Sequence, residues 1–410
     1  MLKTTKLETP VKQVPKYRSI LPILLLILLL TSLIYAHYSW KKITSLRGAN
    51  ANLEQDKSTL SDIKVGLEKE LVGIGGQLKE LKSQDQYVIN KKLEEEIKNI
   101  NSTYKQAVAS YEKLVDLRDN KVKTTTLDDL FAKTLSLLKD RNYASAGATL
   151  VSLDKKIKEE EAKLVASFKI PENVPAFNAP PSSGFRRQTV TLDIGTFLVD
   201  IVTADLNSTR VIVDTATDGD CRNDCPVLSL GEYAARSGAY AGVNGSYFCP
   251  ATYPSCADKK NSFDTLAMNK NKKYINSDNN VYSNVPAVIF SGTSARFVGQ
   301  SSQWGRDTGV DAVLANQPLL VSGGQVAFGG GSDPKQGSRG SRSFVGSTGS
   351  TAYIGVVHNA TVAEVARVLQ AIGIANALNL DSGGSTALWA GGYKVGPGRG
   401  IPNALLFVRK

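Results

Sequence analysis

One segment near the N-terminus constrains the fold of this chain more than any other. Residues 20–40, from Ile20 to Trp40, contain no Asp, Glu, Lys or Arg, and Ile23 to Leu30 is an unbroken aliphatic run. At 1.5 Å per residue, a helix of this length spans about 30 Å, which is the thickness of the hydrocarbon layer of a bilayer. The segment therefore predicts a single transmembrane helix.

The residues on either side of this segment predict its orientation. Residues 1–19 form a basic tail in which one acidic residue, Glu8, opposes five basic ones: Lys3, Lys6, Lys12, Lys16 and Arg18. This asymmetry places the N-terminus in the cytoplasm and everything from Lys41 onward outside it, in a single-pass protein of the cell membrane. A cleaved signal peptide is the alternative, although Tyr35-Ala36-His37 fits a cleavage site poorly.

Residues 41–166 are expected to form a helical stalk. Apolar residues recur every seven positions at Leu46, Leu53, Leu60, Leu67, Ile74 and Leu81, which is typical of a coiled coil. A second run uses Leu93, Ile100, Ala107 and Leu114 in a different phase, so we expect a break near Gln84–Asn90. The pattern predicts a seam, which either a second copy of the chain or another helix of the same chain could fill.

A helical hairpin and a linker follow. Leu127, Leu130, Phe131, Leu135 and Leu138 mark one apolar face, Ala146, Leu150, Leu153 and Ile157 mark another, and residues 140–142 are the expected turn. Residues 167–188 are interpreted as a stiff linker because they hold four prolines.

Residues 189–410 have a different sequence pattern. β-branched runs alternate with Gly-, Ser- and Asn-rich turns, and two short helices are expected at Leu230–Arg236 and Thr361–Ala371, the second opening with a Thr361–Glu364 capping box. The fold class predicted is α+β, with a mostly antiparallel sheet domain after the transmembrane helix and the coiled-coil or hairpin stalk.

The four cysteines lie in two short loops of this last domain. Pairing of Cys221 with Cys225 and of Cys249 with Cys256 is the simplest of three connectivities. A zinc site is the alternative, but spacings of three and six intervening residues differ from the usual two-residue knuckles. We expect disulfides with a structural role, in agreement with an oxidising compartment.

The segment Asn379-Leu380-Asp381-Ser382-Gly383-Gly384-Ser385-Thr386 is the strongest candidate for chemistry. Asp381 is the first charged residue after the apolar strand Ala375–Leu380. The glycines that follow permit a sharp turn and close approach of a ligand, and the hydroxyl groups offer neutral hydrogen bonds. One carboxylate among such donors suits acid–base chemistry on an anionic ligand. The alternative is a glycine turn that Asp381 caps.

Three other segments appear in a fixed order with it: Ala241–Phe248, Arg342–Gly346 and Arg399–Ala404. Over roughly Val190 to Lys410 this ordered set resembles the phosphodiester glycosidase family, which usually has glycine where this chain has Ser382. The resemblance implies hydrolysis of a glycosyl phosphodiester at the anomeric carbon of the sugar, with Asp381 as the catalytic carboxylate. The residues that would bind substrate are Asn244, Gly245, Arg342, Ser382, Gly383, Gly384, Ser385, Thr386 and Arg399.

Three further residues are candidates for the same site. Glu232 and Asp264 could supply a second carboxyl group, or could be a solvated helix charge and a loop cap. His358 follows an apolar strand and could join the site, or could be structural. No metal or cofactor motif is recognised.

The net charge of +11 does not indicate a nucleic-acid partner. Residues 1–170 hold 29 basic and 21 acidic residues, so eight of the eleven excess charges lie in the membrane-proximal half, without interleaved aromatic residues. We therefore expect a membrane-anchored glycosidase acting on a carbohydrate phosphodiester of envelope glycan or exopolysaccharide, with a homodimer through the coiled coil. The alternatives are a non-catalytic glycan-binding or scaffold protein, and a transferase that uses the same site.

Overall fold

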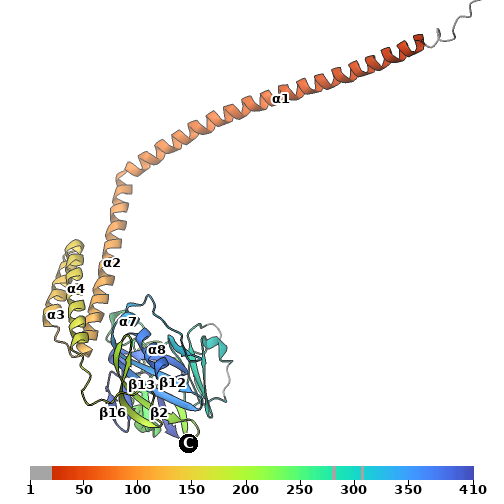
Figure 1. The fold of residues 1–410 in the computed structure, drawn as a ribbon. Coiled ribbons are helices and arrows are strands. Elements are labelled where there is room, and N and C mark those ends of the chain that lie inside the picture. Colours follow the sequence, from red (N-terminus) through yellow and green to blue (C-terminus); the bar gives the residue numbers. More distant parts are fainter. Residues whose placement is uncertain (1–20, 279–282, 306–308) are drawn as a thin grey trace, which may run out of the picture. The chain divides into compact units, whose positions relative to one another are not determined.

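The computed structural model describes residues 21–278, 283–305 and 309–410 of the chain (Figure 1). The basic tail predicted for residues 1–19 and the first residue of the apolar segment, Ile20, lie outside the described residues. The chain divides into two compact units, one ending at Glu96 and the other comprising Ile97–Lys410.

The first unit is built on one long helix, α1 (Leu21–Ser83), of 63 residues. It holds both the apolar segment and the first heptad run, and its N-terminal part is the one stretch, within the described residues, that is long and apolar enough to cross a membrane. The seam leucines of α1 are exposed; Leu60, for example, is 66% accessible. α1 ends before Gln84 and α2 (Asp85–Asp119) begins after it, so the predicted break is confirmed.

The second unit begins with a small helical bundle. The end of α2 packs with α3 (Thr125–Lys139) and α4 (Tyr143–Ser167), and the predicted turn at residues 140–142 joins the last two. Ala107 and Leu114 of the second heptad run are buried among the predicted apolar residues of α3 and α4, including Leu150 and Leu153. Helices of the same chain therefore fill the C-terminal part of this seam, whereas Leu93 at its start is 50% exposed.

Three antiparallel sheets make up the rest of the unit. The seven-stranded sheet has the order β1-β2-β13-β12-β14-β10-β11, and two five-stranded sheets have the orders β16-β15-β4-β17-β3 and β6-β5-β9-β7-β8. The strands of the first are β1 (Gly184–Leu192), β2 (Gly195–Asp205), β10 (Leu319–Ser322), β11 (Gln325–Val326), β12 (Gly340–Thr348), β13 (Thr351–Ala360) and β14 (Asn376–Ser382). Those of the second are β3 (Thr209–Thr215), β4 (Ala241–Asn244), β15 (Leu388–Ala390), β16 (Tyr393–Val395) and β17 (Asn403–Arg409), and those of the third are β5 (Ala267–Met268), β6 (Tyr274–Ile275), β7 (Ala287–Ser291), β8 (Ser294–Val298) and β9 (Ala312–Ala315).

The main core lies between these sheets. Ile354, Phe407 and Phe290, one from each sheet, belong to the same buried cluster. The outer face of the seven-stranded sheet is covered by α8 (Val362–Ala371), and α5 (Leu230–Ser237) packs on the outer face of the second sheet. Shorter helices occur at α7 (Pro334–Gly337), η2 (Pro254–Cys256), η3 (Ser301–Gln303) and η4 (Gly383–Ser385). The α+β class is confirmed.

Two details of this domain refine the sequence interpretation. The capping box predicted at the start of α8 is present, with Thr361 and Glu364 bonded reciprocally. β1 begins at Gly184, inside the predicted linker 167–188, because the pairing with β2 extends over the polar residues Arg186 and Arg187. Arg187 makes two bonds of 2.7 Å to the carboxylate of Asp200 on β2, a long-range pair that apolar periodicity does not reveal.

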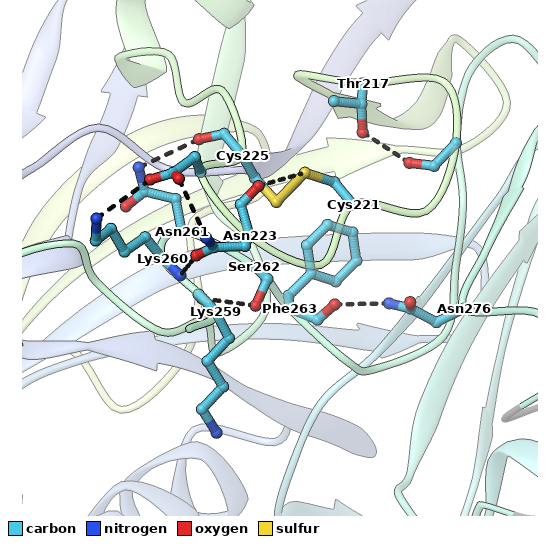
Figure 2. The surroundings of a disulfide bond; sticks show 12 residues. Thr217, Cys221, Asn223, Cys225, Lys259, Lys260, Asn261, Ser262, Phe263 and Asn276 are labelled. Atoms are coloured by element: carbon cyan, nitrogen blue, oxygen red, sulfur yellow. Dashed lines mark hydrogen bonds and ion pairs between the residues drawn. A yellow bond between two sulfur atoms is a disulfide. The ribbon is translucent and has the colours of Figure 1, made fainter. Parts of the chain in front are cut away.

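The disulfides have the predicted local pairing, Cys221–Cys225 and Cys249–Cys256. Figure 2 shows the first of them beside residues 259–263, where the Asn261 side chain donates to the Cys225 carbonyl at 3.2 Å. The same segment bonds to Cys249 through the Asn261 amide. The two disulfide loops are therefore connected by hydrogen bonds through residues 259–263.

Candidate active site

Asp381 stands where two sheets meet. It lies at the end of β14 in the seven-stranded sheet, and its main chain is bonded to the end of β4 in the second sheet. The Asn244 side chain donates to the Asp381 carbonyl at 2.7 Å, and the Asp381 amide donates to the Gly245 carbonyl at 2.9 Å. The backbone that carries the carboxylate is therefore fixed from both sides.

The two residues at the end of β4 that contact Asp381 have a structural role. The buried Asn244 side chain also accepts from Ser343 at 2.7 Å and from the Ala387 amide at 3.1 Å, so its carbonyl oxygen is fully used. A Cβ at Gly245 would lie 1.8 Å from the Asn403 Oδ1 atom. The close approach that requires glycine at position 245 is thus made by a neighbouring side chain of the protein. The structure places both residues next to Asp381 as supports for its backbone.

The turn after Asp381 brings polar groups towards its carboxylate. Gly383 has φ of +65°, a left-handed conformation that favours glycine. The Ser382 amide donates to Asp381 Oδ1 at 2.8 Å, and Ser385 adds a hydrogen bond from its side chain. Thr386 points elsewhere, because its hydroxyl donates to the Ser341 carbonyl at 3.2 Å.

The Asp381 carboxyl group is hard to ionise. Burial raises its pKa to about 6, against the opposing effects of the Ser385 and Ser382 hydrogen bonds and the charges of Arg399 and Lys335. Tyr247 lies in the same electrostatic environment: burial raises its pKa to about 12, with Asp381 and Arg342 acting on it in opposite directions. A carboxyl group that titrates near neutrality can hold or release a proton at physiological pH.

Arg342, on β12 opposite Ser382, is an unusual cation. It is 7% exposed, and its guanidinium donates to the carbonyl groups of Lys335, Ser338 and Ala360. No acidic side chain of the described residues lies within ion-pair distance of it. Burial lowers the pKa of Arg342, and the negative groups of Tyr247, Asp333 and Asp381 oppose this effect without overcoming it. A buried arginine in this state is suited to receive an anion.

Arg399 sits against the turn on the other side. A Cβ added at Gly384 would lie 2.3 Å from Arg399 Nη2 and 2.6 Å from Asp119 Oδ2. Arg399 forms an ion pair with Asp119 at the end of α2 and lies 3.9 Å from Asp116. The Tyr253 hydroxyl also contacts Asp116, and burial raises the pKa of that carboxyl group. The end of α2 therefore contributes carboxylates beside the turn.

His358 belongs to a neighbouring network. Its Nε2 atom lies 2.9 Å from Asp200 Oδ2 and its Nδ1 atom lies 3.2 Å from the Ser341 hydroxyl. Its ring stacks on Phe168, with the centroids 6.2 Å apart. Since the Ser341 carbonyl also receives the Thr386 bond, His358 is linked to the turn through one intermediate residue. This position indicates support for the turn.

Of the two alternative carboxylates, Glu232 is bonded in another part of the fold. Glu232 is exposed and closes the capping box of α5, where its Oε2 accepts from the Ser229 amide and hydroxyl at 2.7 Å each. These bonds lower its pKa. Asp264 is an exposed residue in the segment between the disulfide loops and β5. The described residues also contain no cluster of three metal-ligating side chains.

Five residues near the turn were not recognised from the sequence as parts of a site: Asp116, Asp119, Tyr247, Tyr253 and Lys335. Tyr247 belongs to the segment Ala241–Phe248, but an aromatic side chain in a strand-rich segment is typical of a core residue. The Cys249–Cys256 loop carries Tyr253, whose ring lies 4.8 Å from Lys335 Nζ. The two α2 carboxylates carry no local signal, because their role depends on how α2 packs.

We predict that Asp381→Asn stabilises the fold at neutral pH. The folded-state pKa of about 6 exceeds the ordinary value of 3.8, so ionisation of Asp381 costs stability as pH rises through this window. An amide avoids that cost while keeping an acceptor for the Ser382 amide. Urea unfolding should show a gain of up to about 3 kcal/mol at pH 8 and little gain at pH 4. An equal change at both pH values would contradict this account.

Part of the chain matches a known protein family. Residues 237–408 match the sequence model of the phosphodiester glycosidase family. Solved structures that resemble the chain include the catalytic domain of zebrafish N-acetylglucosamine-1-phosphodiester alpha-N-acetylglucosaminidase, auto-inhibited by its pro-peptide, at 15% identity and a TM-score of 0.43, covering 58% of this chain and 87% of that one.

A protein from Synechocystis also matches at 15% identity and a TM-score of 0.38; the alignment covers 55% of this chain and 62% of that one. The search of curated proteins returned no match. Asp381, Arg342 and Arg399 all lie within the matched range, and residues 237–408 are therefore a domain of the phosphodiester glycosidase family.

Proposed function

We propose that this protein is a membrane-anchored extracytoplasmic glycosidase that hydrolyses a sugar-1-phosphate diester in envelope glycan or exopolysaccharide. One observation carries the proposal. A buried arginine without an acidic partner, Arg342, lies in the same electrostatic environment as Asp381, whose pKa is about 6. The pair offers a place for a phosphodiester anion and a group that exchanges protons close to it.

The roles of the site residues follow from the bond that is cleaved. The bond between the anomeric carbon and the phosphate oxygen is cleaved, the phosphate monoester leaves with the bonding electrons, and water adds to the sugar. A phosphate monoester is a good leaving group, so positioning and neutralising its charge matters more than protonating it. Arg342, Arg399 and Lys335 are the cations available for that task.

Asp381 acts in its ionised form in this scheme. Its carboxylate accepts the proton that the attacking water loses, and its negative charge favours the oxocarbenium character of the transition state. The rate should therefore rise with pH through about 6, the pKa of this group.

We predict that Asp381→Asn abolishes hydrolysis. The assay measures free sugar and phosphate monoester released by the full-length protein from a panel of sugar-1-phosphodiesters. Loss of the general base should lower kcat by about 10²- to 10⁴-fold. Glu232→Gln is the matched control, because it makes the same carboxylate-to-amide change in a capping box and should leave kcat unchanged.

Three outcomes would contradict this account, the first only for Asp381 and the other two for the hydrolase assignment. Release by the Asp381→Asn variant at the wild-type rate would remove Asp381 from the mechanism. Transfer of the sugar to an added glycan acceptor in preference to water would indicate a transferase, and absence of any turnover by a folded wild-type protein would indicate a glycan-binding or scaffold role.

We predict that Asp119→Asn improves the binding of anionic substrates. Asp119 forms an ion pair with Arg399. A phosphodiester that binds this guanidinium must therefore compete with the Asp119 carboxylate. Removing the competing charge from this partly exposed pair should lower KM by about threefold to tenfold, with kcat unchanged.

Asp128→Asn is the control for this experiment, since it breaks an ion pair with Arg118 within the same helical bundle. A rise in KM on the Asp119→Asn change would mean instead that Asp119 holds Arg399 in its working position.

The location of the domain outside the cytoplasm rests on two supports. The apolar part of α1 fits a membrane anchor in length and composition. Two disulfides in the enzyme domain are typical of an oxidising compartment. The glycan of the cell envelope lies on that side of the membrane.

We predict that the exposed seam of α1 joins two copies of the chain. Leu53, Leu60 and Leu67 are each at least 60% accessible, and a second α1 would cover them. Leu60→Lys combined with Leu67→Lys should shift the full-length protein in detergent from dimer to monomer in analytical ultracentrifugation. Ser58→Lys, on the opposite face of the helix, should not; a monomeric wild type would refute the dimer.

A further inference from the structure

A cavity lies at the end of the second sheet that is remote from Asp381. Asn403 at the start of β17 bonds to Ser246 beside the Asp381 backbone, whereas Arg409 at the end of the strand borders this cavity. Six residues of extended strand separate the two positions by about 20 Å. The cavity has a volume of about 540 Å³, and none of the residues that line it belongs to the candidate active site.

The floor of the cavity is a fixed polar network. Asp214 on β3 is 2% exposed, and it accepts bonds from Arg236 at 2.6 and 2.8 Å and from Lys270 at 2.8 Å. Lys270 also donates to the Ser237 hydroxyl at 2.9 Å. These bonds lower the pKa of Asp214 despite its burial, so one carboxylate holds two cations with their charged groups at the cavity. The side chains of Arg236 and Lys270 are therefore ordered before a ligand binds, and binding does not carry the entropic cost of ordering them.

Positive charge exceeds negative charge in this cavity. Five of the residues that line it are basic: Arg210, Arg236, Lys270, Lys272 and Arg409. Asp214 beneath it and Asp311 in its wall are the carboxylates that oppose them, and Asp311 also accepts the Gly292 amide at 2.8 Å. Five positive and two negative groups leave an excess of three. Within the described residues, no acidic side chain lies within ion-pair distance of Arg210 or Arg409.

We propose that this cavity binds an anionic sugar residue, one that carries a phosphate or a carboxylate. Two arginine forks suit either group, because both present paired oxygens to a planar guanidinium. The volume exceeds what the anion alone needs, and Ser237 and Asn271 add hydrogen-bonding groups for hydroxyls. The lining holds one aromatic residue, Tyr240, which gives no stacking platform for a series of bases.

The inference goes beyond the proposed hydrolysis, because it concerns binding and can be measured without turnover. If the substrate is a charged polymer, this site would hold a unit of it about 20 Å from the bond that is cleaved. Such a site would favour polymers over short fragments.

The test is calorimetric titration of the full-length protein in detergent with glucose 6-phosphate, glucuronate and neutral glucose. We expect the two anions to bind and glucose not to. Combining Arg210→Ala with Arg409→Ala should weaken anion binding by about tenfold or more, since each removes a charge-assisted bond. Arg222→Ala, an exposed arginine outside the cavity, is the matched control and should bind like wild type.

A second variant separates this cavity from the active site. Arg399→Met should leave the anion binding of the cavity in place, whether or not the protein proves to be a hydrolase. The proposal fails if the Arg210/Arg409 double variant, with an unchanged melting temperature, binds as tightly as wild type, or if Arg399→Met removes all binding. It also fails if only vesicles containing anionic lipid bind, which would assign the surface to the membrane.

Discussion

The structure depends on one junction, at which the backbone of Asp381 in the seven-stranded sheet is hydrogen-bonded to Asn244 and Gly245 in the second sheet. Neither bond can form unless β14 and β4 end at the same place. Gly245 makes the junction possible, because Asn403 fills the space that any side chain there would need. The backbone that carries the carboxyl group is thus held by hydrogen bonds between two sheets.

The same junction explains the electrostatics of the site. Enclosing Asp381 between two sheets removes water from it and raises its pKa, while the turn that follows supplies only neutral donors close by. The positive charges come from other segments of the chain: Arg342 on β12, Lys335 on α7 and Arg399 near the C-terminus. Cations at that distance moderate the effect of burial without reversing it, and this leaves the carboxyl group able to change its protonation state near neutral pH.

The sequence predicted the elements better than the distances between them. The apolar segment, the break after Ser83, the hairpin of α3 and α4, the capping box of α8 and both disulfides follow from local patterns. A catalytic role for Glu232 required it to lie close to Asp381. In the structure its carboxylate is bonded to Ser229 in the capping box of α5. Arg342 was predicted to bind phosphate, but its burial and its lack of an acidic partner appear only when β12 is placed beside β14.

By itself, the sequence determined the periodicities and the local chemistry: a helix long and apolar enough for a membrane, a charged helical region, a strand-rich domain, and an acidic residue followed by glycines in an ordered set of motifs. Only the tertiary structure decided which groups surround that acid, why Gly245 has no side chain, and that Asp119 from the helical region reaches Arg399. Hydrogen-bonding and apolar patterns within one element act over a few residues and are written in the sequence. Contacts between residues such as 119 and 399 arise from packing, which no short segment encodes.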